Sequence, residues 1–289
     1  MFRDGCEVPP RHHHSVPVPG AATGTLLLMP AWQTGRHLGI KIVTVFPDNS
    51  ARALPAVLGS YVLLDATSGE PVALLDGTAL TLRRTAAASA LAADYLARRD
   101  SAVHLVVGTG ALAPHLARAH AAVRPIHETR IWGRDRAKAE ALAGRLAAEG
   151  LTADPAADLA EAATAADIIS CATLAREPLI CGAWLRPGTH LDLVGGFRPE
   201  MREADDEAVR RATVYIDTEA ALHEAGDLVQ PLASGALTRD RIAGDLFDLV
   251  RSTVHGRCDA RDITLFKSVG TALEDLAAAE LAVARAFQP

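Results

Sequence analysis

Two patterns of hydrophobic and polar positions divide the chain. In its first part, apolar runs of strand length follow one another with short connections, and the last two flank the turn 67–70, which predicts a β-hairpin. The strands are expected at residues 24–30, 38–46, 59–65 and 71–76. A helix is predicted to begin near Ala79 and run to about Leu96. The charged segment 97–102 that follows predicts a domain boundary.

From Val103 onward, short apolar runs alternate with helical patterns. Strands are expected to start at Val103 and Thr129 and to occupy residues 151–153, 167–173, 190–196 and 213–217, with helices at 136–149 and 157–166. This alternation predicts an α/β fold, a doubly wound parallel sheet. A strand at 263–266 and a helix at 272–287 end the chain. In that helix, Glu274 and Asp275 would face water or the sheet, and their spacing alone indicates no catalytic role.

Residues 108–113 fit the pattern G-x-G-x-x-A between the first of these strands and a helix. Gly108 permits the tight turn, Gly110 lets the backbone approach a pyrophosphate, and Ala113 lets the helix pack close to the strand. The helix N-terminus offers N–H groups and a partial positive charge to the same pyrophosphate. The motif predicts a Rossmann-type dinucleotide site. We assign to this site Gly108, Thr109, Gly110 and Ala111.

The end of the second strand predicts the choice of cofactor. An acidic side chain there would bind the ribose hydroxyls of NAD, but this strand ends in Trp132-Gly133-Arg134. A guanidinium at Arg134 can pair with a 2′-phosphate, which favours NADPH and leaves NADH as the alternative. The other interpretation of Arg134 is a solvated residue at a helix start. We expect Asp135 to cap the next helix.

Ligands of doubly wound sheets bind at the carboxyl ends of the strands. Thr173, Gly195 and Phe197 follow predicted strands, so we expect them near the nicotinamide ring, with Phe197 shaping the ring pocket or serving as a core residue. Ser268 and Gly270 precede the last helix, where they would donate N–H groups to a ligand or cap the helix.

Composition limits the classes of function. The chain has 289 residues, 49% hydrophobic and 22% charged, as in an ordinary globular protein. A net charge of −6 gives no support for nucleic-acid binding, and no apolar run is long enough to span a membrane. The four cysteines form no C-x-x-C pair, so we expect reduced thiols in a cytoplasmic protein.

Two unusual features remain in the first part of the chain. The adjacent histidines 12–14 suggest a metal site, but no acidic or cysteine cluster follows at ligand spacing, so we expect no metal. Lys41 interrupts an apolar strand, where a lysine must reach water, a partner or a ligand. The alternative for Lys41 is an outward position on an edge strand.

Taken together, these blocks resemble the ornithine cyclodeaminase/μ-crystallin family over nearly the whole chain. The segments that carry the resemblance are 28–32, 39–43, 74–78, 84–89, 108–110, 186–190, 224–227 and 266–275. Within the family, residues 192–203 are similar to the block found in reductases of Δ1-pyrroline-2-carboxylate and Δ1-piperideine-2-carboxylate.

The resemblance implies a homodimer with two domains in each subunit. Residues 1–99 and 265–289 would form an α+β domain for substrate binding and dimerisation, and residues 100–264 the Rossmann-type domain. Arg11 and Arg84 would hold the substrate carboxylate, and Lys41 would lie beside the imine. The implied reaction is NAD(P)H-dependent reduction of these cyclic α-imino acids to L-proline or L-pipecolate.

The sequence departs from the family pattern at two places. Phe197 stands where ornithine cyclodeaminases carry a catalytic aspartate, which argues against conversion of ornithine to proline and ammonia. The family has a further N-terminal helix and strand before the first matched block, so we expect part of the first domain's core to be missing. Ornithine cyclodeaminase and a non-catalytic, NADP-dependent binding protein like μ-crystallin remain the alternatives.

Overall fold

A computed structural model describes residues 1–287, which form two compact units. Unit 1 comprises Met1–Thr85 together with the segment from Thr271 onward, and unit 2 comprises Ala86–Gly270. The structure moves both expected domain boundaries. The first lies inside helix α1 (Gly77–Leu96) rather than after it, because the second half of α1 packs within unit 2. The second lies after strand β13 (Thr264–Lys267), which pairs with unit 2 strands on both sides.

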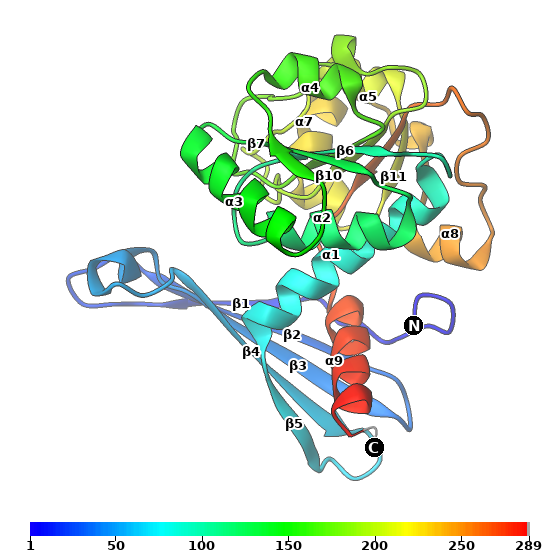
Figure 1. Cartoon of the computed structure of the whole chain (residues 1–289). Coiled ribbons are helices and arrows are strands. Elements are labelled where there is room, and N and C mark those ends of the chain that lie inside the picture. Colours follow the sequence, from blue (N-terminus) through cyan, green and yellow to red (C-terminus); the bar gives the residue numbers. More distant parts are fainter. Residues whose placement is uncertain (288–289) are drawn as a thin grey trace. The chain divides into compact units, whose positions relative to one another are not determined.

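Unit 1 is built on a five-stranded antiparallel sheet whose strands lie in chain order (Figure 1). The strands are β1 (His12–Val16), β2 (Gly24–Trp32), β3 (His37–Val45), β4 (Val57–Asp65) and β5 (Pro71–Asp76). A short 3-10 helix, η1 (Pro47–Arg52), joins β3 to β4. The sequence did not predict β1, which contains the histidine run as an exposed edge strand. Asp76 caps α1 by accepting hydrogen bonds from the backbone N–H groups of Thr78 and Ala79.

Helix α9 (Ala272–Ala286) covers one face of this sheet. Alternate residues of the strands, such as Ala31 and Leu63, are fully buried with Leu276 and Ala279 of α9. The intervening residues form the opposite face, and the strand register aligns four of them in one row. This row is Pro30, Ile40, Val62 and Leu74. Leu74 is 76% exposed.

Unit 2 confirms the predicted doubly wound α/β fold. Its eight strands are all parallel, in the order β12-β11-β13-β10-β9-β6-β7-β8. The remaining strands are β6 (Val103–Val107), β7 (Glu128–Trp132), β8 (Ala153–Pro155), β9 (Ile168–Cys171), β10 (His190–Leu193), β11 (Thr213–Ile216) and β12 (Ile242–Asp245). The strand order reverses between β6 and β9, which is where such folds bind their ligands.

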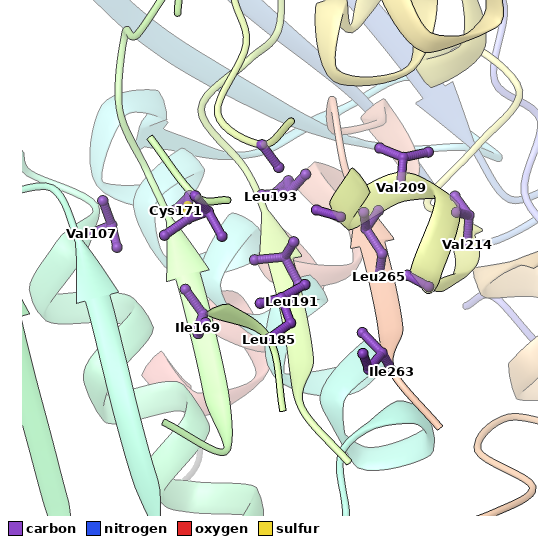
Figure 2. Packing of buried hydrophobic residues seen from close by; sticks show 14 of the residues in the cluster. Val107, Ile169, Cys171, Leu185, Leu191, Leu193, Val209, Val214, Ile263 and Leu265 are labelled. Atoms are coloured by element: carbon purple, nitrogen blue, oxygen red, sulfur yellow. The ribbon is translucent and has the colours of Figure 1, made fainter. Parts of the chain in front are cut away.

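Helices cover both faces of the parallel sheet (Figure 1). On one side lie α2 (Ala113–Val123) and α3 (Arg136–Ala148), and on the other α4 (Leu159–Ala165) and α5 (Asp206–Arg211). The shorter elements are α6 (Ala221–Glu224), α7 (Gly226–Ser234), α8 (Leu246–Arg251) and the 3-10 helices η2 (Gly182–Trp184) and η3 (Arg239–Arg241). Figure 2 shows the apolar core on the α4 and α5 side, where Ile169, Leu191 and Leu265 are fully inaccessible to solvent.

The other sheet face carries a buried polar row. Asp192 accepts hydrogen bonds from the hydroxyls of Ser89 and Ser170, and Ser170 also contacts the His104 ring. Burial lowers the pKa of His104 well below its usual value, so this ring is neutral at physiological pH. The polar row therefore adds hydrogen bonds to this packing layer without adding a buried imidazolium.

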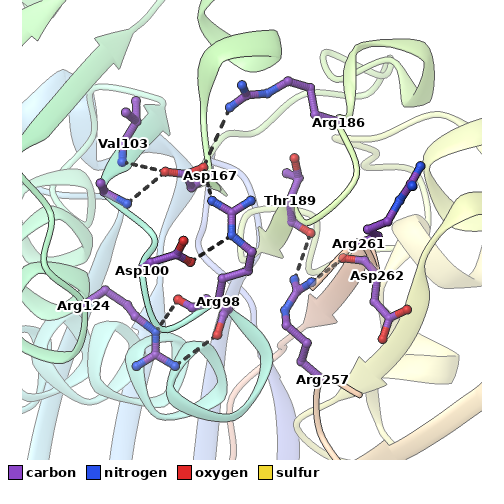
Figure 3. Close-up of polar contacts among 12 residues, drawn as sticks. Arg98, Asp100, Val103, Arg124, Asp167, Arg186, Thr189, Arg257, Arg261 and Asp262 are labelled. Atoms are coloured by element: carbon purple, nitrogen blue, oxygen red, sulfur yellow. Dashed lines mark hydrogen bonds and ion pairs between the residues drawn. The ribbon is translucent and has the colours of Figure 1, made fainter. Parts of the chain in front are cut away.

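Figure 3 shows a second polar network, at the amino ends of the strands. Arg124 donates to the carbonyls of Ala93 and Ala97, which are at the end of α1, and Asp167 accepts from Arg98 and from the N–H group of Val103. Cations at a helix C-terminus stabilise it. This network holds the end of α1 at the amino ends of the strands. Doubly wound folds bind their ligands at the opposite, carboxyl ends of the strands.

Candidate active site

The glycine turn has the shape that the motif predicts. Gly108 adopts φ +122°, and a Cβ there would lie 2.7 Å from the carbonyl oxygen of Ala172. A Cβ on Gly110 would meet nothing within 4 Å, so space for a ligand lies above the backbone. Ala113 is fully buried at the start of α2, which has no side-chain cap, whereas Asp135 caps α3. These features fit a bound pyrophosphate.

A matched pair of alanine variants separates the fold from the ligand at this turn. We expect Gly108→Ala to destabilise the protein by about 1–3 kcal/mol, because it strains the backbone and clashes with Ala172. Gly110→Ala is expected to change the free energy of unfolding by less than about 0.5 kcal/mol, yet to weaken NADPH binding. Urea denaturation and a fluorescence titration with NADPH measure the two effects. Equal NADPH affinity in wild type and Gly110→Ala would contradict the assignment of Gly110.

Arg134 lies where the sequence places it, directly after β7. Its side chain is exposed and makes no hydrogen bond or ion pair within residues 1–287. Asp135 accepts from the backbone N–H of Lys138 and caps α3, as expected. The guanidinium is thus available to an anion at this edge of the sheet.

The structure brings the other expected cofactor residues to this same edge. Gly108, Thr173, Gly195 and Ser268 follow the neighbouring strands β6, β9, β10 and β13. Their backbones touch: a Cβ on Gly195 would lie 2.1 Å from the Thr173 carbonyl oxygen. The carboxyl ends of these strands therefore form a continuous rim, which we call the cofactor rim and define as residues 108–111, 173, 195–197 and 268–270.

Two expectations about the cofactor rim need correction. The backbone N–H of Gly270 donates to Asp217 and that of Ser268 to the carbonyl of Leu193, so neither N–H is available to a ligand. A buried carboxylate and a neighbouring strand already take these donors. Phe197 is no core residue, since it is 44% exposed beside Arg198. Its role in a ring pocket stays a prediction.

In unit 1, Lys41 and Arg84 meet around two acids of α9. The Lys41 ammonium lies 2.6 Å from one carboxylate oxygen of Asp275, and Arg84 Nε lies 3.0 Å from the other. Glu274 accepts from Arg84 at 2.7 Å. All four side chains are buried, so we call them the buried ion cluster. Lys41 is on the central strand β3, which rules out the edge-strand alternative.

The environment of the buried ion cluster changes the pKa of Lys41. Burial and the nearby Arg84 guanidinium lower the pKa of Lys41 from 10.5 to about 8, against the opposing effect of Asp275. An ammonium with this pKa can release a proton close to neutral pH. Within residues 1–287, Asp275 is the one acceptor that Lys41 contacts, so the ammonium keeps N–H groups for a bound anion or imine.

Tyr61 lies on the same face of the unit 1 sheet as Lys41. It pairs with Lys41 across β3 and β4, and its fully buried hydroxyl has no hydrogen-bond partner within residues 1–287. A Cβ on Gly39 would collide with this phenol, which explains a glycine in the middle of β3. A buried hydroxyl without a partner is costly, so a ligand or water that reaches it gains a hydrogen bond.

Arg11 lies directly before the edge strand β1 and is partly buried. Its place near a substrate stays a prediction. Sequence reasoning missed Glu274 and Asp275, although two buried cations require counter-charges. It also missed Glu203, Asp227 and Lys267, which are fully buried in unit 2.

The chain is similar to proteins of known activity along most of its length. A Δ1-pyrroline-2-carboxylate reductase of Paracoccus denitrificans is 45% identical over 259 residues, which cover 89% of this chain and 82% of that protein. The solved structure of the Thermococcus litoralis Δ1-pyrroline-2-carboxylate reductase in complex with NADH and L-proline is 35% identical, with a TM-score of 0.89 over 99% of this chain and 88% of that one. An archaeal alanine dehydrogenase dimer with bound NAD is 27% identical, with a TM-score of 0.89 over 99% and 88% of the two chains.

The family model for the ornithine cyclodeaminase/mu-crystallin family matches residues 7–288. The match spans both units, with the buried ion cluster in one and the glycine turn in the other. The chain belongs to the ornithine cyclodeaminase/mu-crystallin family.

Proposed function

We propose that the protein reduces cyclic α-imino acids with NAD(P)H, converting Δ1-pyrroline-2-carboxylate to L-proline and Δ1-piperideine-2-carboxylate to L-pipecolate. The observation that carries this proposal is the buried ion cluster, which presents a lysine of lowered pKa beside an arginine. These substrates join an imine to a carboxylate, and the two cations match those two groups. The likeness to two Δ1-pyrroline-2-carboxylate reductases supports the choice of substrate.

Unit 1 is proposed to bind the substrate. Arg84 suits the substrate carboxylate because its planar guanidinium can form two parallel hydrogen bonds, and Asp275 and Glu274 hold it in place. Arg11 is proposed to bind the same substrate carboxylate. Lys41 donates a proton to the imine nitrogen, so the nitrogen ends as an amine when the carbon gains hydride. Burial of the cluster keeps water away from these charges and strengthens their effect.

Unit 2 is proposed to bind the nicotinamide cofactor, which supplies the hydride when bound. The turn 108–111 and the start of α2 hold the pyrophosphate, and Arg134 pairs with a 2′-phosphate. Thr173, Gly195 and the side chain of Phe197 border the nicotinamide end. The open space above Gly110 and the exposed, unpaired Arg134 support this assignment.

Arg134 is expected to decide between NADPH and NADH. Arg134→Ala should raise the KM for NADPH about tenfold, because a charge-assisted pair with the 2′-phosphate is lost. The KM for NADH should change little. Steady-state kinetics with both cofactors make the comparison, with the exposed Arg136→Ala on α3 as control. A parallel rise in both KM values would contradict the assignment.

The proposed activity is tested by mixing the protein with NADPH or NADH and each imine, and following the absorbance of the reduced cofactor. We expect oxidation with both imines. Ornithine without added reductant tests the cyclodeaminase alternative, for which ammonia is the readout. The exposed phenyl ring of Phe197 cannot accept a proton from an amine, so we expect no ammonia. Cofactor binding without turnover of either imine would favour the non-catalytic binding protein.

We propose that two copies pair through the sheet face opposite α9. The row Pro30, Ile40, Val62 and Leu74 is apolar, and exposed apolar patches of this kind mark interfaces. The dimeric archaeal alanine dehydrogenase supports a second copy as the partner.

Leu74→Lys is expected to convert the dimer to a monomer, because the interface would have to bury an unpaired charge. Light scattering coupled to gel filtration measures the mass. Leu281→Lys, at an exposed position on α9, is the control and should remain dimeric. A monomeric wild type, or a dimeric Leu74→Lys, would contradict this interface.

All four cysteines are free thiols, and this supports the assignment to the reducing cytoplasm. Within residues 1–287, no helix combines the length and apolar character of a membrane span.

A further inference from the structure

Glu203 is a fully buried acid that the proposed reaction does not use. It lies beyond β10 in the chain, and its carboxylate connects the ends of two strands. One oxygen accepts from the backbone N–H and the hydroxyl of Thr173, both at 2.7 Å. The other accepts from the backbone N–H groups of Gly195 at 2.8 Å and Gly196 at 3.3 Å. Four donors of the cofactor rim thus converge on one side chain.

The glycines of this turn allow that convergence. A Cβ on Gly195 would lie 2.4 Å from a Glu203 oxygen, and a Cβ on Gly196 would lie 2.3 Å from an Asp227 oxygen. No side chain fits between this backbone and the carboxylates. The turn 195–196 therefore rests directly on Glu203 and Asp227, and its conformation follows theirs.

Asp227 and Lys267 hold Glu203 in turn. Asp227, on α7, accepts from the Glu203 backbone N–H at 2.7 Å, and Lys267, at the end of β13, lies 3.1 Å from Asp227. All three side chains are fully buried. The Cys171 thiol on β9 is within electrostatic range of these acids, and burial and their charges raise its pKa, so it stays protonated. Lys267 also acts on the buried carboxylates of Asp217 and Asp192, so Glu203 and Asp227 do not have this ammonium to themselves.

We propose that Glu203 is a positioning residue that holds Thr173 and the turn 195–196 in the conformation that receives the nicotinamide cofactor. This inference rests on the proposed function, because it assigns Glu203 to the binding of that cofactor. Glu203 touches neither cofactor nor substrate in this role and acts through the backbone of the rim.

The ionisation of Glu203 makes the rim sensitive to pH. Burial and repulsion from Asp227 raise the pKa of Glu203 from 4.5 to about 7, while Lys267 acts in the opposite direction. Ionised Glu203 accepts on both oxygens. A proton on the oxygen beside Gly195 and Gly196 would point at their N–H groups, and a proton on the other oxygen would reverse its hydrogen bond with the Thr173 hydroxyl. Either change alters the hydrogen bonds that hold the rim when the pH falls below about 7. Cofactor affinity is expected to fall with it.

Global stability should respond to this group in the opposite direction. The folded protein binds this proton more tightly than the unfolded chain, so the contribution of Glu203 to the free energy of unfolding falls as pH rises through about 7. Cofactor affinity rises over the same range. If Glu203 only stabilised the fold, cofactor affinity and the free energy of unfolding would not change in opposite directions with pH.

The test compares Glu203→Gln with Asp167→Asn. Asp167 accepts backbone N–H groups and an arginine at the amino ends of the strands, so its variant reports loss of an anchoring carboxylate away from the rim. Dissociation constants for NADH and NADPH are measured by fluorescence titration across neutral pH, without substrate. NADH carries no 2′-phosphate, so its titration excludes ionisation of that group.

In wild type, the affinity for both cofactors should fall as the pH drops through about 7. Glu203→Gln should bind both about tenfold more weakly above neutral pH and lose this dependence, because the amide cannot accept on both sides. Asp167→Asn should keep the wild-type pH profile. If wild type binds cofactor without pH dependence, or if Glu203→Gln behaves like wild type, the inference is wrong while the proposed function stands. If wild type binds neither dinucleotide, both are wrong.

Discussion

Lys41→Met is expected to lower kcat for reduction of Δ1-pyrroline-2-carboxylate by about 100-fold or more, the usual contribution of a positioned proton donor. Methionine keeps the length of the side chain but removes the ammonium next to Asp275. Arg84 then remains as the one cation beside Asp275 and Glu274, so we also expect a loss of stability, which urea denaturation measures separately from kcat. The dissociation constant for NADPH should not change, because Lys41 is not among the residues proposed to bind the cofactor.

The pH profile identifies the role of Lys41. In wild type, kcat should fall as the pH rises above about 8, because the proton that Lys41 donates is lost. Lys41→Arg keeps a cation that does not titrate in this range, so this alkaline limb should disappear. The exposed Lys138→Met on α3 is the control and should match wild type. Unchanged kcat in Lys41→Met would remove Lys41 from the mechanism.

Asp275→Asn is expected to destabilise the protein by about 3–5 kcal/mol, the usual result of removing one partner from a buried ion pair. Asp275 is fully buried and bridges Lys41 and Arg84, so the variant leaves two cations without the carboxylate between them. Urea denaturation measures the loss. Asp275 raises the pKa of Lys41, so its loss should lower that pKa. The fall of kcat at alkaline pH should then begin at a lower pH than in wild type.

A double variant separates the charge from the packing at this position. Lys41→Met combined with Asp275→Asn removes one cation together with the anion, so it should recover part of the lost stability. The coupling energy between the two substitutions then measures the interaction. If the two losses simply add, the ion pair between Lys41 and Asp275 does not stabilise the fold.

Sequence reasoning predicted the strands and helices that have a clear period and clear ends. The runs at β5 and β6, the helix α3 and the glycine turn all lie where local pattern placed them. Strand β8 was expected at 151–153 but forms at Ala153–Pro155. Gly150 has φ +93°, and the Leu151 N–H returns to Leu146, so Leu151 packs as part of the α3 cap.

The region between β11 and β13 gave too weak a pattern to predict. The helices α6, α7 and α8 are 4, 9 and 6 residues long, and β12 is an edge strand with an irregular register beside Gly244. Their positions depend on packing against the sheet rather than on local periodicity. The same holds for β1, whose exposed histidines have no apolar alternation.

The site shows the same division between local and long-range information. Lys41 stood out because a cation within an apolar strand needs a partner, whereas Arg84 was assigned from the family resemblance. Asp275 could have been paired with them, since it lies on the helical face that also carries Ala272 and Leu276. Glu203 gave no such signal, because its partners are backbone N–H groups that only the folded strands bring together.

The measurement that tests the central claim most directly follows the hydride. The protein is incubated with Δ1-pyrroline-2-carboxylate and NADPH that carries deuterium at the transferring position of nicotinamide C4, and the product is analysed by mass spectrometry and NMR. We predict L-proline with deuterium at its α-carbon, and unlabelled L-proline when Δ1-pyrroline-2-carboxylate is reduced with ordinary NADPH. Unconsumed cofactor, or proline without deuterium, would contradict the account.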